Sequence, residues 1–182
     1  VAGPQCTSIL ADFGAEVIRI ENEQNLDYCR SIPPVLSEES PNASGLFNEL
    51  NRNKLGVTLN VLHPQGLELL QDLIAISDVV VENFSSRVLE RWGLDYVSQK
   101  HIKPDIIYLS MSGFGHTGRD RDHVTWGPTA QALSGLTYMS GLPHREPAGW
   151  GFSYMDHTAG HYGAMAVMMA IHHRNRTGEG QW

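Results

Sequence analysis

The sequence predicts an α/β fold, with an open, mostly parallel, Rossmann-like sheet and flanking helices. Short apolar runs rich in β-branched residues alternate along the chain with longer segments of helical periodicity, an order typical of repeated strand-helix units. Two of these runs, residues 78–84 and 105–112, lack polar alternation, which indicates strands buried on both faces of a parallel sheet. Ligands of such sheets bind at the carboxyl ends of the strands.

The first half of the chain is predicted to contain two helices and two strands. A helix over residues 3–15 precedes a strand over 16–22, and a strand over 56–61 precedes a helix over 64–77. Between these units, residues 24–48 collect Asn, Pro, Ser and Glu, which favours an irregular exposed loop. A loop of this length is expected to be a lid or a mobile excursion.

The second half continues the alternation. Residues 85–93 are predicted to be helical, with a Ser N-cap and a Gly stop, and residues 94–102 continue helically before the strand over 105–112. A long apolar helix is expected from Thr158 onward. Its small residues Ala159, Gly163, Ala166 and Ala170 are predicted to form one narrow face where another helix or the sheet approaches closely.

The composition is that of an ordinary globular domain. The 182 residues are 41% hydrophobic and 18% charged, which suffices for one core and is too mixed for a transmembrane class. The net charge of −7, with no dense basic run, argues against nucleic acid as a partner. Two cysteines suit a reducing compartment, so we expect a cytoplasmic location, although a targeting segment is not observable without an initiator Met. We expect a single domain over residues 1–182, the N-terminal part of a large domain that is truncated at both ends.

Residues 112–118 contain the pattern G-x-G-x-x-G after a predicted strand, through Gly113, Gly115 and Gly118. This pattern can bind a dinucleotide, but only where a helix begins within the glycine run so that its N-terminus meets the pyrophosphate. Here a charged stretch closed by Pro128 follows. The next helix is therefore expected well downstream, and an NAD site is not favoured.

Residues 153–163, SYMDHTAGHYG, place Asp156 at the start of the last predicted helix. An N-cap role would satisfy free N–H groups there. Asp156 could also ligate a metal with His157 and His161, which share a helix face, but no acidic residue lies between the histidines as it does in zinc-protease helices. The glycines and aromatics before Asp156 leave room for a ligand to approach the carboxylate. Four aromatic residues nearby hint at a bulky acyl pocket but also fit simple packing: Trp126, Trp150, Phe152 and Tyr154.

Several segments together resemble, in family order, the class III CoA-transferases, a group that contains the formyl-CoA, carnitine and benzylsuccinate CoA-transferases. The segments are GPQCTSILADFGAEVIRIE, NRNKLGVTLN, DVVVENF, RWGLDY, PDIIYLSMSGFG, GPTAQALSGL and MDHTAGHYGAMAVMMAIHHRNRTGEGQ. The match runs nearly from end to end. No single segment is specific, but the ordered set is.

The resemblance implies that Asp156 is a nucleophile that attacks an acyl-CoA thioester and forms first an aspartyl-acyl anhydride and then an aspartyl-CoA thioester. CoA then passes to an acceptor carboxylic acid. Coenzyme A and acyl-CoA are thus substrates rather than tightly bound cofactors, no metal takes part, and the expected protein partner is a second copy in an interlocked homodimer. No membrane partner is expected. The implied CoA contacts are Val1, Ala2, Asn53, Lys54, Asn83, Phe84, Ser85 and Arg91.

Two departures from the family pattern leave alternatives open. Many relatives carry an Arg at the CoA phosphates where this chain has Asn22 and Glu23, and the family's first strand, small second domain and glycine-rich loop are not within these residues. A catalytically incomplete CoA-binding or dimerisation fragment is one alternative. The other is an α-methylacyl-CoA racemase, which uses an acid/base pair. Its His and Asp would fall on Trp126 and Gly127, which favours transfer, while His123 nearby keeps the racemase alternative open.

Overall fold

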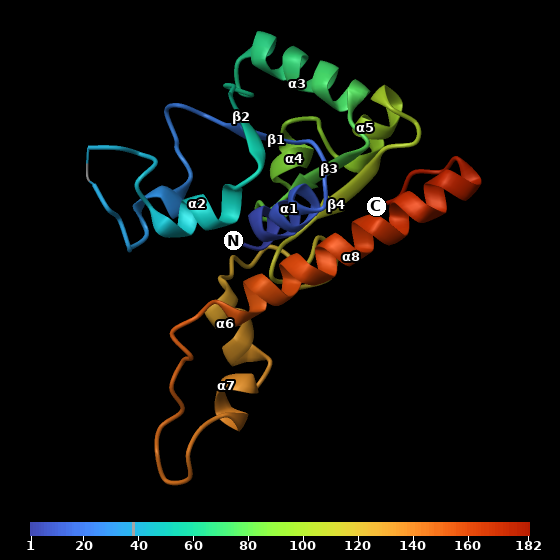
Figure 1. The fold of residues 1–182 in the computed structure, drawn as a ribbon. Coiled ribbons are helices and arrows are strands. Elements are labelled where there is room, and N and C mark those ends of the chain that lie inside the picture. Colours follow the sequence, from blue (N-terminus) through green and yellow to red (C-terminus); the bar gives the residue numbers. More distant parts are fainter. Residues whose placement is uncertain (38) are drawn as a thin grey trace.

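The computed structural model describes residues 1–37 and 39–182 and confirms the α/β class with parallel strands (Figure 1). The strands are β1 (Val17–Glu21), β2 (Lys54–Thr58), β3 (Val79–Glu82) and β4 (Ile107–Ser110). The helices are α1 (Ala2–Asp12), the 3-10 helix η1 (Tyr28–Ser31), α2 (Gly45–Asn51), α3 (Pro64–Ile76), α4 (Val88–Arg91), α5 (Tyr96–Ile102), α6 (Gly127–Leu133), α7 (Leu136–Met139) and α8 (Tyr154–Thr177).

The four strands form two parallel pairs. β1 pairs with β2 from Val17 opposite Lys54, and β3 pairs with β4 from Val79 opposite Ile107. Within residues 1–37 and 39–182 no ladder joins the two pairs, and a cavity of about 640 Å³ lies between them, lined by residues of both β1 and β3. The main core lies beside the second pair. It contains Ile74, Leu89, Leu94, Ile106 and Tyr108 from α3, β4 and the segments around α4.

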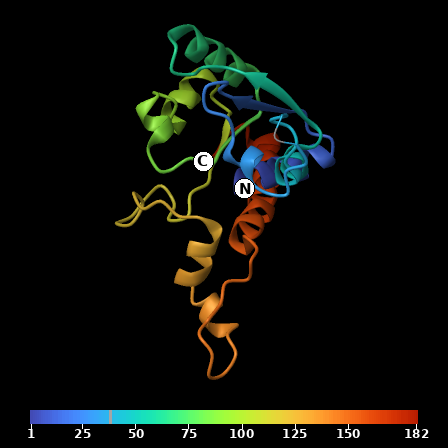
Figure 2. The ribbon, with the colours of Figure 1, turned by 90° about the vertical axis from the view of Figure 1, so that its left-hand side faces the viewer.

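Small residues bring α8 against α1 and β4, as Figures 1 and 2 show from two sides. A Cβ added at Gly160 would lie 2.7 Å from the Cβ of Gln5, and one at Gly163 would lie 3.2–3.3 Å from side chains of α1 and β4 and the residue after β4. A narrow face of small residues is therefore confirmed, but its predicted position is partly wrong because Ala166 is exposed. The buried face is Gly160, Gly163, Ala164, Val167 and Ala170, which follows the helical spacing set by the contact at Gly160.

Local boundaries depart from the sequence expectations for identifiable reasons. The Gly stop predicted for the helix over 85–93 is confirmed, because Gly93 has φ 69° directly after the C-cap residue of α4. The helical continuation over 94–102 is the separate helix α5, which Asp95 caps by accepting the Ser98 N–H. Helix α4 begins after Arg87, which has φ 65°, so the predicted Ser N-cap is wrong. The irregular loop over 24–48 contains η1 and the start of α2, which pack together through Cys29, Phe47 and Leu50.

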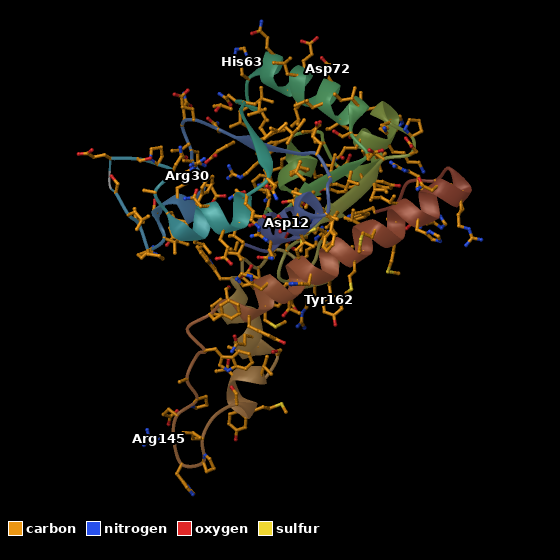
Figure 3. The ribbon with its side chains drawn as sticks, viewed as in Figure 1. Asp12, Arg30, His63, Asp72, Arg145 and Tyr162 are labelled. Carbon is orange, nitrogen blue, oxygen red and sulfur yellow. The ribbon has the colours of Figure 1, made fainter. Side chains whose placement is uncertain are left out.

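Helices α6 and α7 and the loop over 140–152 project from the body of the molecule as an arm, which we define as residues 127–152 (Figures 1 and 2). Arg145 lies near its tip, and Tyr162 points from α8 away from α1 (Figure 3). Tyr162 belongs to an exposed apolar stripe on α8 with Met165, Met168 and Met169, whose exposed fractions run from 46% to 72%. No helix within residues 1–37 and 39–182 combines the length and apolar character needed to span a bilayer.

The contact at Gly160 predicts a stability difference between two substitutions. In Gly160→Ala the new Cβ would meet the Cβ of Gln5 at 2.7 Å and the backbone oxygen of Ala2 at 3.0 Å, atoms that cannot rotate away. We expect the free energy of unfolding to fall by about 1–3 kcal/mol. Gly163→Ala is the control with a smaller expected loss, because its neighbours are the ends of flexible side chains. Denaturant unfolding of the complete protein measures both, and unchanged stability in Gly160→Ala would contradict this packing.

Candidate active site

Asp156 lies in the first turn of α8 and is held by groups from two segments. Its Oδ2 accepts the backbone N–H of Gly127 at 3.0 Å and the hydroxyl of Ser153. Ser153, not Asp156, is the N-cap residue of α8, so the predicted N-cap role is wrong for that helix. The carboxylate instead satisfies the first N–H of the neighbouring helix α6. A carboxylate at this place is favourable because the first N–H groups of a helix have no partner within the helix.

Gly127 is where the backbone of α6 comes closest to this carboxylate. A Cβ built on Gly127 would collide with Asp156 Oδ2 and Ser153 Oγ, so only glycine fits while the hydrogen bond exists. The preceding Trp126 packs edge-on against Tyr28 of η1, with ring centroids 5.5 Å apart. The loop over 24–48 therefore reaches the neighbourhood of Asp156. Because neither Trp126 nor Gly127 can exchange a proton, the acid/base pair of the racemase alternative has no counterpart at these positions.

The two histidines beside Asp156 are held by protein groups. His157 Nδ1 lies 3.1 Å from Gln5 Oε1, its ring stacks on Phe152 at 4.6 Å, and burial lowers its pKa. His161 Nδ1 lies 2.7 Å from the carbonyl oxygen of His157. Among the described residues, no group of three or more His, Cys, Asp or Glu is placed to hold a metal ion. His157 thus ties the start of α8 to α1.

The glycine pattern after β4 forms turns without a helix. Gly115 and Gly118 have φ of 73° and 87°, and residues 112–126 contain no helical turn before α6 begins at Gly127. The downstream helix start expected from the sequence is confirmed. The geometry that a dinucleotide would need, a helix N-terminus within the glycine run, is absent from these described residues.

Several of the predicted CoA contacts gather around the start of α1. Asn83, directly after β3, accepts the Gly3 N–H through Oδ1 at 3.0 Å and donates from Nδ2 to the Met111 carbonyl at 2.8 Å. Its amide therefore ties α1 to the ends of both β3 and β4. Val1 and Ala2 open the same turn, and the Ala2 carbonyl faces Gly160 of α8. One turn of α1 thus links Asn83 to the helix that carries Asp156.

Lys54 also reaches this turn, from the other strand pair. Its Nζ donates to the carbonyl oxygens of Pro4 and Leu50 at 2.8 and 2.6 Å and to the Asn51 side chain at 3.2 Å. Burial lowers the pKa of Lys54 to about 8. Asn53, with φ 59°, donates its side-chain amide to Asp12 at 2.9 Å.

The remaining predicted contacts lie on the segment after β3. Phe84 is about half exposed and packs edge-on against Trp92, and the side chains of Ser85 and Arg91 are exposed. These three residues follow one another around the turn that leads into α4 and through that helix. They are accessible to a ligand that approaches the carboxyl end of β3.

Sequence reasoning missed a buried polar cluster at the end of β3. Glu82 is 7% exposed, accepts the Phe84 N–H at 2.7 Å and the Tyr108 hydroxyl at 3.2 Å, and lies 3.5 Å from His116 Nε2. Burial raises the pKa of Glu82 to about 7 and lowers that of His116. The sequence feature that could have revealed this cluster is Glu82 itself, an acidic residue at the end of an otherwise apolar strand. Gln131 of α6, also buried, was missed because nothing in a helical stretch of small residues distinguishes it.

Comparisons with known proteins assign the chain to a family. The sequence profile of CoA-transferase family III matches residues 1–182. The chain belongs to CoA-transferase family III. It is 37% identical, over its whole length and 44% of the relative, to the succinyl-CoA–L-malate CoA-transferase beta subunit of Chloroflexus aurantiacus. It is 36% identical, over its whole length and 46% of the relative, to the succinate–glutarate CoA-transferase of Agrobacterium fabrum.

A solved structure of the same family superposes closely. The crystal structure of a CAIB/BAIF family protein from Brucella suis matches with a TM-score of 0.93 and 37% identity, covering all of this chain and 48% of that one. The chain therefore spans about half the length of the curated relatives and the solved structure that it matches. The two curated relatives are named as CoA-transferases, and the racemase alternative is not favoured.

Gly127 offers a direct test of the site geometry. In Gly127→Ala the added Cβ occupies the space of the carboxylate, so we expect the Asp156 side chain to leave the Gly127 N–H and the free energy of unfolding to fall by about 1–3 kcal/mol. A crystal structure and denaturant unfolding of the variant measure both effects. Gly149→Ala is the matched control, because nothing lies within 4 Å of a Cβ at that position. An Asp156 carboxylate in its original place would contradict the described contact.

The raised pKa of the buried Glu82 carboxyl predicts that the stability of the protein depends on pH. Its pKa is about 7 in the folded chain against an ordinary 4.5, so between these values the unfolded chain binds fewer protons and stability falls as pH rises. We expect the free energy of unfolding to decrease by about 3 kcal/mol or less from pH 4.5 to pH 7.5 on account of this group. Glu82→Gln removes that slope, which denaturant titrations at several pH values measure. The same slope in wild type and variant would show that Glu82 is not its source.

Proposed function

We propose that the complete protein transfers CoA from an acyl-CoA thioester to a carboxylic acid, with Asp156 as the nucleophile. The observation that carries this proposal is the unequal environment of the two carboxylate oxygens. Oδ2 is held by Gly127 and Ser153, whereas Oδ1 has no hydrogen bond among residues 1–37 and 39–182. A half-buried carboxylate held at one oxygen presents the other to an electrophile in a defined direction.

The proposed reaction uses only acyl exchange at this carboxylate. Asp156 Oδ1 attacks the thioester carbonyl carbon, the C–S bond breaks, and a mixed anhydride and CoA thiolate result. The thiolate then attacks Cγ of Asp156, which expels the donor carboxylate and leaves an aspartyl-CoA thioester. The acceptor carboxylate attacks the same carbon and expels the thiolate. Finally the thiolate attacks the acceptor acyl carbon, so that Asp156 is freed and the new acyl-CoA leaves.

Gly127 and Ser153 have a specific task in the two steps at Cγ. When a nucleophile adds to Cγ, negative charge collects on Oδ2, the oxygen that already accepts the Gly127 N–H and the Ser153 hydroxyl. Donors already aimed at an oxygen that becomes an oxyanion stabilise the transition state without reorganisation. A single amide N–H and one hydroxyl would therefore serve as the oxyanion hole for the aspartyl carbon.

The proposed CoA site is the group Val1, Ala2, Asn53, Lys54, Asn83, Phe84, Ser85 and Arg91. The side chains of Phe84, Ser85 and Arg91 are exposed and can contact the CoA moiety of the acyl-CoA substrate. Asn83 and Lys54 are supported in a positioning role, because their polar atoms already hold the first turn of α1. That turn adjoins Gly160 of α8, one helical turn beyond Asp156.

We further propose that the chain is the large-domain portion of a subunit that forms an interlocked homodimer. Two features support this proposal: the exposed apolar stripe of Tyr162 and three methionines on α8, and the projecting arm. Both are surfaces that a second subunit would cover. The succinyl-CoA–L-malate CoA-transferase of Chloroflexus aurantiacus has an alpha and a beta subunit by name. Because the curated relatives are named for succinate, malate and glutarate, we propose that the complete protein exchanges short-chain carboxylic acids.

The nucleophile is tested by trapping. Complete protein is incubated with an acyl-CoA and quenched with hydroxylamine or borohydride, and we expect mass spectrometry to find the modification on Asp156. Asp156→Asn should lower kcat by more than about 1,000-fold, since no carboxylate remains to form the anhydride. Asp72→Asn, on the outer side of α3, is the matched control and should act as wild type (Figure 3). An unmodified Asp156, or exchange of the α-proton of the acyl-CoA without an acceptor acid, would falsify the transfer mechanism.

A further inference from the structure

A buried acid and a buried imidazole meet where β3 ends. Glu82 is the last residue of β3 and directly precedes residues 83–85, which belong to the proposed CoA site. His116 lies in the turns that follow β4. Its Nε2 is 3.5 Å from Glu82 Oε1, and the side chains of His116 and Glu82 are 15% and 5% exposed. That separation is at the outer limit of a hydrogen bond, so the protons on the two groups decide whether they attract each other.

Both groups lack something that burial normally requires. His116 Nε2 has no hydrogen-bond partner within residues 1–37 and 39–182, and unpaired buried nitrogens are costly and rare. In the same part of the chain, His116 is the single ion-pair neighbour of Glu82, and a buried carboxylate without a cation is costlier still. Burial raises the pKa of Glu82 to about 7 and lowers the pKa of His116, so it favours the neutral form of each group.

A single proton on Glu82 Oε1 satisfies both groups. Oε2 then acts as the carbonyl oxygen of the acid and accepts the Phe84 N–H at 2.7 Å. Oε1 accepts the Tyr108 hydroxyl at 3.2 Å and donates its own proton toward His116 Nε2. That nitrogen is an acceptor in the neutral tautomer that carries its proton on Nδ1. Without the proton, the carboxylate is a negative charge buried beside a neutral ring.

The neighbouring titratable and charged groups leave this proton to the pair. Burial raises the pKa of Tyr108 on β4, so its hydroxyl keeps its proton. Arg121 approaches the backbone of His116, since its Nη1 lies 3.5 Å from the His116 carbonyl oxygen. Arg87, which precedes α4, forms an ion pair with Asp122 at 3.2 Å. This ion pair joins the same two segments, after β3 and after β4, that the buried pair joins.

The buried pair connects the CoA site to the segment that leads into α6. On one side, Glu82 Oε2 holds the Phe84 N–H, so the pair fixes the place where residues 83–85 leave the sheet. On the other side, residues 112–126 follow β4 and run through His116 to the start of α6. Loss of the contact therefore removes a support from both segments.

From these observations we propose that a proton on Glu82 Oε1, donated to His116 Nε2, holds residues 83–85 in the conformation that binds CoA. Glu82 and His116 are positioning residues, because they act through the turn and not by contact with the substrate. When the carboxyl loses this proton, the buried charge draws Glu82 toward water and the turn loses its support. This inference rests on the proposed CoA site, and it adds a dependence of CoA affinity on pH.

Calorimetric titration of the complete protein with CoA at pH 6 and pH 8 tests the role of the proton. If only the protonated form binds, a pKa of about 7 makes the apparent Kd about tenfold higher at pH 8. Glu82→Gln replaces the acid with a neutral amide that can donate to His116 at both pH values. Ionisation of the CoA phosphates affects both proteins alike. We therefore expect the ratio of Kd at pH 8 to Kd at pH 6 to be about tenfold larger in wild type than in Glu82→Gln. Equal ratios would overturn the inference.

Substitutions at His116 separate a positioning role from a general loss of stability. His116→Leu removes the acceptor, and we expect the Kd for CoA at pH 6 to rise by about tenfold. His116→Gln offers an amide oxygen to the Glu82 proton and should bring the Kd to within about threefold of wild type. The matched control is His101→Leu, which should bind CoA as wild type does, because His101 is an exposed residue of α5. Binding by His116→Gln as weak as that by His116→Leu would contradict the shared proton.

Nitrogen-15 NMR of the His116 ring in the wild-type protein tests the proton assignment without CoA and without any variant. At pH 6 we expect the ring proton on Nδ1 and none on Nε2, because Nε2 accepts the Glu82 proton. A proton on Nε2 at pH 6 would overturn the inference.

Failure of this inference and failure of the proposed function give different results. Wild type that binds CoA with the expected difference between pH 6 and pH 8 but leaves Asp156 unmodified supports this inference and overturns the proposed nucleophile. Wild type that modifies Asp156 but shows the same Kd ratio as Glu82→Gln overturns this inference alone. Wild type that binds no CoA at either pH overturns both.

Discussion

The close approach of α8 to α1 is the constraint on which the rest of this structure depends. Gly160 lies so near Gln5 and the Ala2 carbonyl that no side chain fits there, and this proximity places the first turn of α8 beside the first turn of α1. Asn83 then fixes α1 to β3 and β4 through two hydrogen bonds. The position of Asp156 relative to the strand ends follows from these contacts of α1 with α8 and with Asn83.

The second consequence of this arrangement is that Asp156 belongs to one helix and is held by another. Its own helix carries it in the first turn, but the N–H that binds Oδ2 comes from α6. A carboxylate that capped its own helix would have its oxygens turned back toward that helix. Capping the neighbouring helix uses one oxygen and leaves the other accessible. The same glycine that permits this contact leaves no space for a side chain at position 127.

Buried polar groups mark the surroundings of the site. Glu82 is kept near the end of β3 by an N–H and a hydroxyl, and Lys54 uses its donors on backbone oxygens of α1 and α2. Gln131 of α6 keeps a buried Nε2 without a hydrogen-bond partner among the described residues. The first two are internally satisfied and therefore structural. Gln131 is the one among these three whose donor lacks a partner among the described residues.

The sequence by itself determined the α/β class, the order of strands and helices, the downstream start of α6 and the family, because these depend on local periodicity, turn residues and ordered motifs. It also identified Asp156 as the residue of interest. Only the tertiary structure decided which helix Asp156 caps, since Gly127 lies 29 positions away in sequence and its N–H reaches the carboxylate only after α6 and α8 pack together. The burial of Glu82 and Gln131 and the face of α8 that contacts α1 were decided in the same way. Each depends on which distant segment covers a residue, and local pattern carries no information about that.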